Sequence, residues 1–139
     1  MSEEIQNFNR GIVEEFRANG GKVGGMFEGK DLLLLTTTGA KSGQERVSPL
    51  VYHRDGERLV IIASYGGADK HPAWYHNIVA NPKVRIDLGD GASTEATAVV
   101  HAEGAEHDRL YAEVAERMPQ FAEYQRKTKR IIPVVVLER

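Results

Sequence analysis

Residues 44–64 read QERVSPLVYHRDGERLVIIAS. Segments 44–53 and 58–64 of this stretch have the alternation and the β-branched residues of strands, and Asp55-Gly56 between them is a tight-turn signal. We therefore expect the two segments to pair as an antiparallel hairpin. Pro49 has no amide hydrogen to donate, so we expect it at a sheet edge or at a bulge.

The rest of the chain repeats this pattern of strands joined by turns. About six strands are expected in all, over 32–38, 44–53, 58–64, 83–87, 93–101 and 131–138, with Gly89-Asp90-Gly91 as the turn of a second hairpin. Three helices are expected, over 3–18, 72–80 and 105–118, and the glycine-rich segment 20–30 predicts a flexible connection or a short bulged strand. Because strands follow strands instead of alternating with helices, we expect an α+β, mainly β, fold in which an antiparallel sheet closes into a small barrel with helices outside.

Composition narrows the class of protein. The chain has 139 residues, no cysteine and a formal net charge of −2, which fits a single domain over 1–139 and excludes disulfide scaffolds and thiol catalysis. The charge shows no electrostatic footprint for nucleic acid. No apolar run approaches the roughly 18–20 residues of a transmembrane segment, and the acidic start MSEE has no secretory h-region, so we expect a cytoplasmic protein.

The N-terminal segment 3–18 has the spacing of an amphipathic helix. Apolar residues recur at three- and four-residue steps, at Ile5, Phe8, Ile12, Val13 and Phe16. A lid or a membrane-surface contact are alternative roles for such a helix. Its polar face carries acidic residues that anionic lipids repel, so we expect it to pack on the rest of the domain.

Three stretches hold the candidate functional residues. In the first, 36–46, Gly39 and Gly43 bracket Lys41 and Ser42, and Arg46 begins the next strand. A glycine-rich turn exposes backbone amides and the two cations add charge, so the turn suits a phosphate or carboxylate; the competing interpretation is an ordinary hairpin turn with solvated charges. The spacing matches neither a Walker A loop nor a dinucleotide fingerprint.

The second stretch, 63–77, leads from a strand through Gly66-Gly67 into a helix and holds the only tryptophan. Trp74 and Tyr75 suit a wall against a planar ring. Adjacent helix residues point about 100° apart, so we expect one of the two to pack the helix on the barrel instead.

The third stretch, 118–128, places Phe121 and Tyr124 three residues apart, where they either share a pocket or pack the last helix.

The sequence gives no support for hydrolase or metal chemistry. Ser64 is not in a G-x-S-x-G elbow, and the five-residue spacing of His71 and His76 does not match a shared metal on one helix face, so we expect no metal site.

Taken in order, these stretches resemble the deazaflavin-dependent nitroreductase family of actinobacteria. The resemblance covers about residues 32–137, and its ordered motifs are LLTTTG with Lys41, Gly43, Gln44 and Arg46, then Pro49-Leu50, Ala63-Ser64, Gly66-Gly67, Pro72, Trp74-Tyr75, Asn77, Ala80-Asn81-Pro82, Tyr124-Gln125 and Ile132-Pro133. It implies a split β-barrel and a reductase that uses coenzyme F-420, an 8-hydroxy-5-deazaflavin with a phosphate and an oligoglutamate tail. FMN is the less favoured cofactor.

The resemblance also implies roles for individual residues. Lys41, Ser42 and Arg46 would hold the phosphate and the anionic tail. The deazaflavin ring would be bordered by Val47, Ser48, Pro49, Ile62, Ala63, Ser64, Ala73, Trp74, Tyr75 and Asn77. The substrate would contact Val51, Met118, Phe121 and Tyr124, and the proton would come from Tyr124, Ser64, Tyr65 or water.

The sequence departs from the family pattern at several of these positions. Tyr65 stands where relatives often carry a lysine, and Ala40 where they often carry an arginine, which removes two tail contacts. Met118 and Phe121 stand where the best-known member has substrate-pocket tyrosines, and Val51 where a tyrosine can occur. These changes weaken the case for nitroimidazole or menaquinone as the substrate.

Two functional hypotheses follow. In the first, the protein is an enzyme that transfers a hydride from the reduced deazaflavin to an electron-poor alkene or lactone, quinone or nitro compound. In the second, it is a binding module that holds a flavin, a haem-derived pigment or a fatty acid without turnover. The pair Lys41 and Arg46 suits a long anionic tail better than a fatty acid, which favours the enzyme, and exposed strand edges leave room for a homodimer.

Overall fold

The computed structural model describes residues 3–89 and 93–139, without the side chains of residues 3–7 and 26. Within these ranges the strands are β1 (Leu32–Thr38), β2 (Glu45–Val51), β3 (His53–Asp55), β4 (Arg58–Ile62), β5 (Lys83–Asp87), β6 (Ser93–His101) and β7 (Val134–Glu138). The α-helices are α1 (Glu3–Ala18), α2 (Ala73–Ala80), α3 (Ala105–Arg117) and α4 (Gln120–Arg126), and the short 3-10 turns are η1 (Gly25–Phe27) and η2 (Tyr65–Gly67). No helix in these ranges combines the length and the apolar character needed to cross a bilayer.

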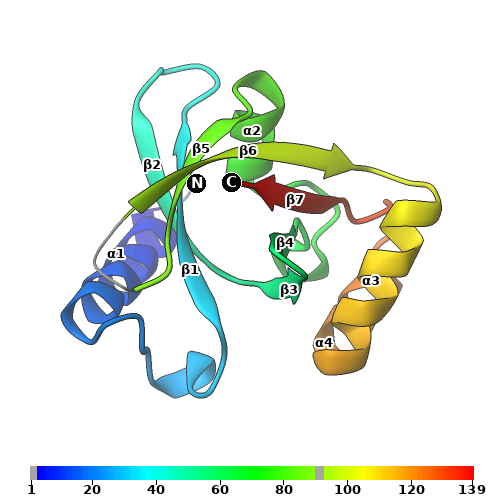
Figure 1. Cartoon of the computed structure of the whole chain (residues 1–139), viewed down its shortest axis with the longest axis horizontal. Helices are drawn as coiled ribbons and strands as arrows, with labels where there is room; N and C mark the ends of the chain where they lie inside the picture. Colours follow the sequence, from blue (N-terminus) through cyan, green and yellow to red (C-terminus); the bar gives the residue numbers. More distant parts are fainter. Residues whose placement is uncertain (1–2, 90–92) are drawn as a thin grey trace.

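The seven strands form one antiparallel sheet that curls into a split barrel (Figure 1). Its order is β2-β1-β5-β6-β7-β4-β3, so β2 and β3 are the two edges of the sheet. These edges are also consecutive in the chain, and the single residue Tyr52 joins them. A sheet whose two edges are joined by one residue has to curl until those edges meet at that end, which accounts for the barrel shape.

The hairpin expected between 44–53 and 58–64 is wrong for the part of its first segment that ends at Val51. Over its whole length β2 pairs with β1, and only the three-residue β3 pairs with β4 around Asp55-Gly56. The chain changes partner at Tyr52, which is buried and donates its amide hydrogen to the Asp31 carbonyl oxygen. Pro49 lies on the edge strand β2, as its missing amide hydrogen requires.

Two other expectations are met only in part. Of the two alternatives for segment 20–30, the bulged strand is wrong, and the segment is a connection made of turns and η1. The helix expected over 105–118 is followed by a fourth helix, because Met118, which precedes Pro119, has φ −134° and ψ 85°, so α3 ends there and α4 starts beyond it. The second hairpin, β5 with β6, has the expected bounds, while Asp90 and Gly91 of its turn lie outside the described residues.

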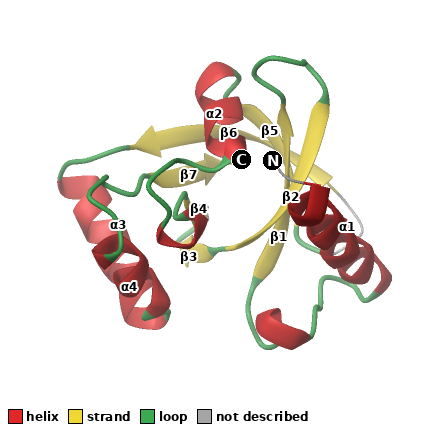
Figure 2. Ribbon diagram, turned by 180° about the vertical axis from the view of Figure 1, so that it is seen from behind, coloured by secondary structure: helices red, strands yellow, loops and turns green. Residues whose placement is uncertain are grey.

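The core has one layer inside the barrel and two layers outside it (Figure 2). Alternate residues of β1 separate two of these layers, since Leu33 and Leu35 point into the barrel while Leu32 and Leu34 lie under α1. On the far side of the molecule, α3 and α4 cover the outer faces of β4 and β7. Strands buried on both faces explain why LLLL and VVVL are continuous apolar runs.

Helix α1 packs on the outer face of the sheet through its C-terminal half. Val13 and Phe16 are buried there, as the sequence predicts. Phe8 is 51 % exposed and does not belong to the packed face, so this part of the expected stripe is wrong. The side chain of Ile5 lies outside the described residues.

Candidate functional site

The β1–β2 turn is closed by hydrogen bonds of its own. The amide of Gly39 donates to the Gln44 carbonyl (2.8 Å), and that of Gly43 donates to the Gly39 carbonyl (3.0 Å). Gly43 has φ +70°, a conformation that glycine adopts at little cost, and a β-carbon on Gly39 would lie 2.6 Å from Ser42 Oγ. The glycines that bracket Lys41 are therefore required by the shape of the turn.

Lys41 and Ser42 are exposed on this turn, and Arg46 is exposed just beyond it, as the second residue of β2. Among the described residues neither Lys41 nor Arg46 forms an ion pair, while the nearest acid, Glu45, is paired with Arg85. Two uncompensated cations near one turn fit a ligand with several negative charges. The residues present here therefore suit a phosphate with a carboxylate tail.

Asn77 joins the first stretch of candidate residues to the second. It lies on α2, is buried, and accepts a hydrogen bond from the Ala40 amide (3.0 Å) through Oδ1. Its Nδ2 donates to Thr37 Oγ1 (3.1 Å) on β1. The turn that carries Lys41 is thus attached to the helix that carries Trp74 and Tyr75.

Arg130 joins the second stretch to the third, and the sequence argument missed it. Its guanidinium donates to the carbonyl oxygens of Ala63, Ser64 and Ala68 at 2.8–3.2 Å, and its Nη1 lies 3.2 Å from His71 Nδ1. Burial lowers the pKa of Arg130. An arginine four residues before β7 gave no local signal, because its partners lie about 60 residues away.

Helix α4 packs directly on η2. A β-carbon on Gly67 would lie 2.8 Å from the Tyr124 carbonyl oxygen, so only glycine permits this approach. The ring of Tyr124 meets that of Phe121 edge-on, with centroids 5.5 Å apart. The structure thereby places the 64–67 segment, which carries Ser64 and Tyr65, next to the helix that carries Tyr124, and the role of these three residues as proton donors stays a prediction.

Trp74 and Tyr75 have the different environments that their adjacency predicts. Trp74 is 7 % exposed and packs in the barrel interior, whereas Tyr75 is half-buried and its ring lies 4.4 Å from that of His71. Burial raises the pKa of Tyr75.

Burial lowers the pKa of the neighbouring His71, with smaller contributions from the charges of Arg130 and His76. The ring nitrogen that faces Arg130 has to accept a hydrogen bond, so Nε2 carries the proton of neutral His71.

The other expected ring contacts lie on β2, at the end of β4 and at the start of α2, and they face different layers of the molecule. Ser48 and Pro49 are half-buried on β2, and Val47 packs under α1. Ala63 faces the barrel interior, Ile62 faces α3 and α4, and Ala73 is exposed at the start of α2.

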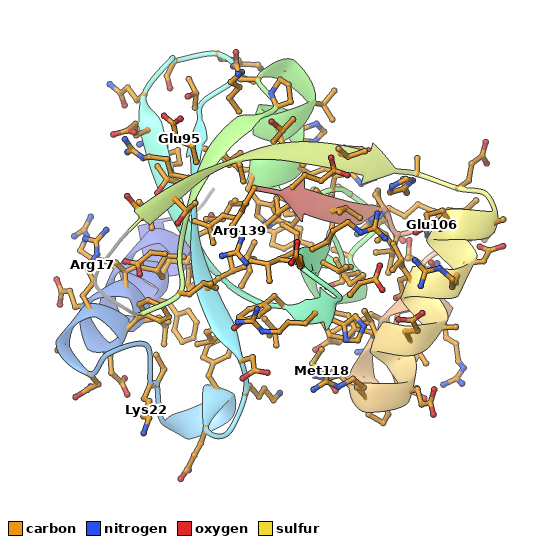
Figure 3. The ribbon with its side chains drawn as sticks, in the orientation of Figure 1. Arg17, Lys22, Glu95, Glu106, Met118 and Arg139 are labelled. Carbon is orange, nitrogen blue, oxygen red and sulfur yellow. The ribbon has the colours of Figure 1, made fainter. Side chains whose placement is uncertain are left out.

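The expected substrate residues fall into two groups. Met118, Phe121 and Tyr124 share the outer cluster of α3 and α4, with Met118 at the junction of these helices (Figure 3). Val51 packs in the cluster under α1. Within a single chain, three of the four expected substrate residues therefore lie in one cluster. The role of all four in binding substrate stays a prediction.

Two open hollows lie elsewhere on the described surface. One of about 340 Å³ is bordered by the threonines at the end of β1, beside the β1–β2 turn, and by charged residues of β2, β5, β6 and the C-terminus, and another of about 760 Å³ lies between α1 and Tyr52. Neither includes a residue of α2 or η2. The uncompensated cations Lys41 and Arg46 lie instead at the β1–β2 turn, which is attached to α2. No group of three or more His, Cys, Asp or Glu residues in the described ranges has the arrangement of a metal site.

Comparison with known proteins gives the family. The family model described as F420H(2)-dependent quinone reductase matches residues 8–139. The chain belongs to this family. It is therefore an oxidoreductase that uses coenzyme F420, which confirms the sequence-based resemblance.

Individual relatives agree with this assignment. The F420H(2)-dependent quinone reductase Rv1261c of Mycobacterium tuberculosis is 40 % identical over 126 residues, which cover 89 % of this chain and 85 % of the relative. A solved F420-H2 dependent reductase, FDR-A, matches with a TM-score of 0.70 and 42 % identity over 78 % of this chain and 94 % of its own. A further structure, described as a domain-swapped dimer, matches with a TM-score of 0.72 and 37 % identity over 98 % of both chains. This member of the family thus has the split-barrel fold that its strand pattern predicts.

Proposed function

We propose that this F420-dependent reductase uses a quinone or a similarly electron-poor small molecule as its acceptor, and that the assembly of the β1–β2 turn, α2, η2 and α4 is its active site. The observation that carries the location is the pair of uncompensated cations, Lys41 and Arg46, on a turn that Asn77 attaches to α2. The names of the relatives support the quinone class.

In this proposal the protein binds and orients, while the coenzyme supplies the hydride when it is bound. Lys41, Ser42 and Arg46 hold the phosphate and tail by charge-assisted hydrogen bonds. The ring lies against Tyr75 and the segment that Arg130 fixes, with Ser64 at its border. The Ser64 hydroxyl has no hydrogen-bond partner among the described residues, so it is available to a ligand.

The acceptor lies on the α4 side of the ring in this proposal. The half-buried Met118 contributes apolar surface there, the buried Phe121 supports the ring of Tyr124, and the phenol of Tyr124 supplies the proton. Val51 belongs to a different cluster of the same chain. A second copy paired through the exposed edge of β2 is the arrangement that we propose for bringing it to the acceptor, in line with a relative described as a domain-swapped dimer.

Quenching of Trp74, the only tryptophan, measures binding of F420, and the absorbance of the coenzyme measures turnover with a quinone. We expect Lys41→Ala and Arg46→Ala each to weaken F420 binding by about 1–3 kcal/mol, because each removes a charge-assisted contact. Lys22→Ala is the matched control, since Lys22 lies at the opposite end of the molecule (Figure 3). Unchanged affinity in both turn variants would refute the location, and failure of every quinone with bound coenzyme would refute the acceptor.

A further inference from the structure

We propose that Asn77 is a positioning residue that couples the tail-binding turn to the ring-binding helix, so that the two halves of the coenzyme are recognised together. The proposal rests on the proposed function of the turn and of α2. It goes further by giving Asn77 a role through its protein partners instead of a contact with the ring.

The β1–β2 turn has one hydrogen bond to a helix. Its shape comes from its own backbone, through the bonds between Gly39 and Gln44 and between Gly43 and Gly39. Among the hydrogen bonds of the described residues, only the one from the Ala40 amide to Asn77 Oδ1 links residues 39–43 to another element. The shape of the turn is therefore local, while its placement relative to α2 depends on Asn77.

The two anchor points of Asn77 lie next to the two tail cations. Ala40 directly precedes Lys41, and Thr37 is the cross-strand partner of Arg46. One side-chain amide thus holds the backbone N–H that precedes Lys41 and the side-chain hydroxyl of the residue opposite Arg46. The orientation of this group is fixed, because the Ala40 amide can only donate and the group has to present its oxygen there.

Asn77 is also tied to the ring side of the site. It is three residues from Trp74 on α2, so the two side chains lie on one face of the helix. Both are buried, with 8 % and 7 % of their surfaces exposed, which leaves Asn77 little surface for a ligand. Thr37 is 1 % exposed, so the bond between Thr37 and Asn77 is shielded from water and keeps α2 at a fixed distance from β1. Such preorganisation lowers the ordering cost of binding a ligand that spans both elements.

The test compares two ligands, the complete coenzyme F420 and the tail-free deazaflavin, which lacks the phosphate and the glutamates. We expect Asn77→Ala to weaken binding of F420 about tenfold and to change binding of the tail-free deazaflavin by less than about twofold, since only the first ligand reaches the turn. In a Lys41→Ala background the Asn77→Ala loss should shrink, because the two residues act on one contact.

A second pair of variants leaves Asn77 intact. Thr37→Val removes the acceptor for Asn77 Nδ2 and should lower F420 affinity in the same ligand-selective way, whereas Thr37→Ser keeps the hydroxyl and should retain wild-type affinity. Equal losses for both ligands in Asn77→Ala, or an unchanged F420 affinity in both Asn77→Ala and Thr37→Val, would overturn the positioning role. Failure of the wild-type protein to bind F420 would instead overturn the location of the site, so the two failures are distinguishable.

Discussion

Arg130 donates from Nη2 to the carbonyl oxygen of Ser64 over 2.8 Å, across 66 positions of sequence. The same guanidinium also holds the carbonyls of Ala63 and Ala68. Ser64 lies two residues beyond the end of β4, directly before η2. One half-buried cation therefore fixes the backbone on the ring side of the proposed site.

Replacing Arg130 with lysine should loosen this segment. A single ammonium cannot reproduce a planar fork that serves three carbonyls and His71, so we expect Arg130→Lys to lower the free energy of unfolding by about 2–3 kcal/mol. Binding of the tail-free deazaflavin should weaken in parallel. Denaturant titrations and Trp74 quenching measure the two effects.

Arg126→Lys is the matched control for this substitution. Arg126 is exposed and forms its ion pair with Glu123 on the same helix, so its replacement should leave both stability and binding unchanged within error. Similar losses in the two variants would mean that the carbonyl contacts of Arg130 have no special part in the site.

Gly67 should tolerate a side chain less well than its neighbour Gly66. Both have positive φ, +86° and +65°, so each alanine substitution costs about 1 kcal/mol in backbone strain. Only at Gly67 does the new β-carbon meet the Tyr124 backbone, at 2.8 Å, while Gly66 has open space. We expect Gly67→Ala to lower both stability and turnover beyond Gly66→Ala, as measured by urea unfolding and by quinone reduction. Equal effects of the two alanines would show that α4 does not depend on this close approach.

The strands were predictable because hydrophobic period and turn signals are local. The bounds of β1, β5, β6 and α1 follow directly from LLLLTTT, from the Gly89-Asp90-Gly91 signal and from apolar spacing. The pairing of β2 was not predictable from Asp55-Gly56, because the choice of partner depends on the burial of Tyr52 and its bond to Asp31. A local turn signal determines where a chain reverses, and tertiary packing determines which strand it joins.

The residues of the candidate site likewise divide into those with a local sequence signal and those without one. Lys41 and Arg46 stood out in the sequence because their glycine turn is a local pattern. Asn77 drew attention only by resemblance, and Arg130 not at all, since their hydrogen-bond partners lie 37 to 67 residues away. Side chains that connect elements have no periodic signature, and the structure is needed to find them.

Alkaline pH should destabilise the protein through Tyr111. Its hydroxyl is buried and donates to the Phe121 carbonyl, and burial raises the pKa of Tyr111 to about 12. The unfolded chain ionises this group near its ordinary pKa of about 10, so the unfolded state binds fewer protons above that pH. Stability should thus be constant with respect to this group below about pH 10 and fall between about pH 10 and 12, by up to about 1.4 kcal/mol per pH unit.

The Tyr111→Phe variant tests this assignment through the slope of the free energy of unfolding against pH. The variant loses a hydrogen bond, which shifts stability at every pH, so the comparison concerns the pH dependence of the free energy of unfolding and not its value. Burial also raises the pKa of Tyr75, and some alkaline loss should therefore persist in the variant. An unchanged slope between about pH 10 and 12 would show that Tyr111 ionises alike in both states.

Tyr124 should be the proton donor for the reduced acceptor. Of the three candidate hydroxyls, on Ser64, Tyr65 and Tyr124, a phenol is a much stronger acid than the alcohol of Ser64. In the described structure the Tyr124 ring also has two contacts that Tyr65 lacks, the edge-on contact with Phe121 and the ammonium of Lys127, 5.9 Å from the ring centroid. Tyr124→Phe keeps the ring contacts and removes only the hydroxyl. We expect kcat for quinone reduction to fall about 100-fold, with F420 affinity and unfolding unchanged, because general acid catalysis contributes about 10²–10⁴-fold.

Tyr65→Phe is the matched control and should retain kcat within about threefold. A loss of kcat in Tyr65→Phe with none in Tyr124→Phe would reverse the assignment, and full activity in both would exclude the two phenols and leave Ser64 or water as the donor.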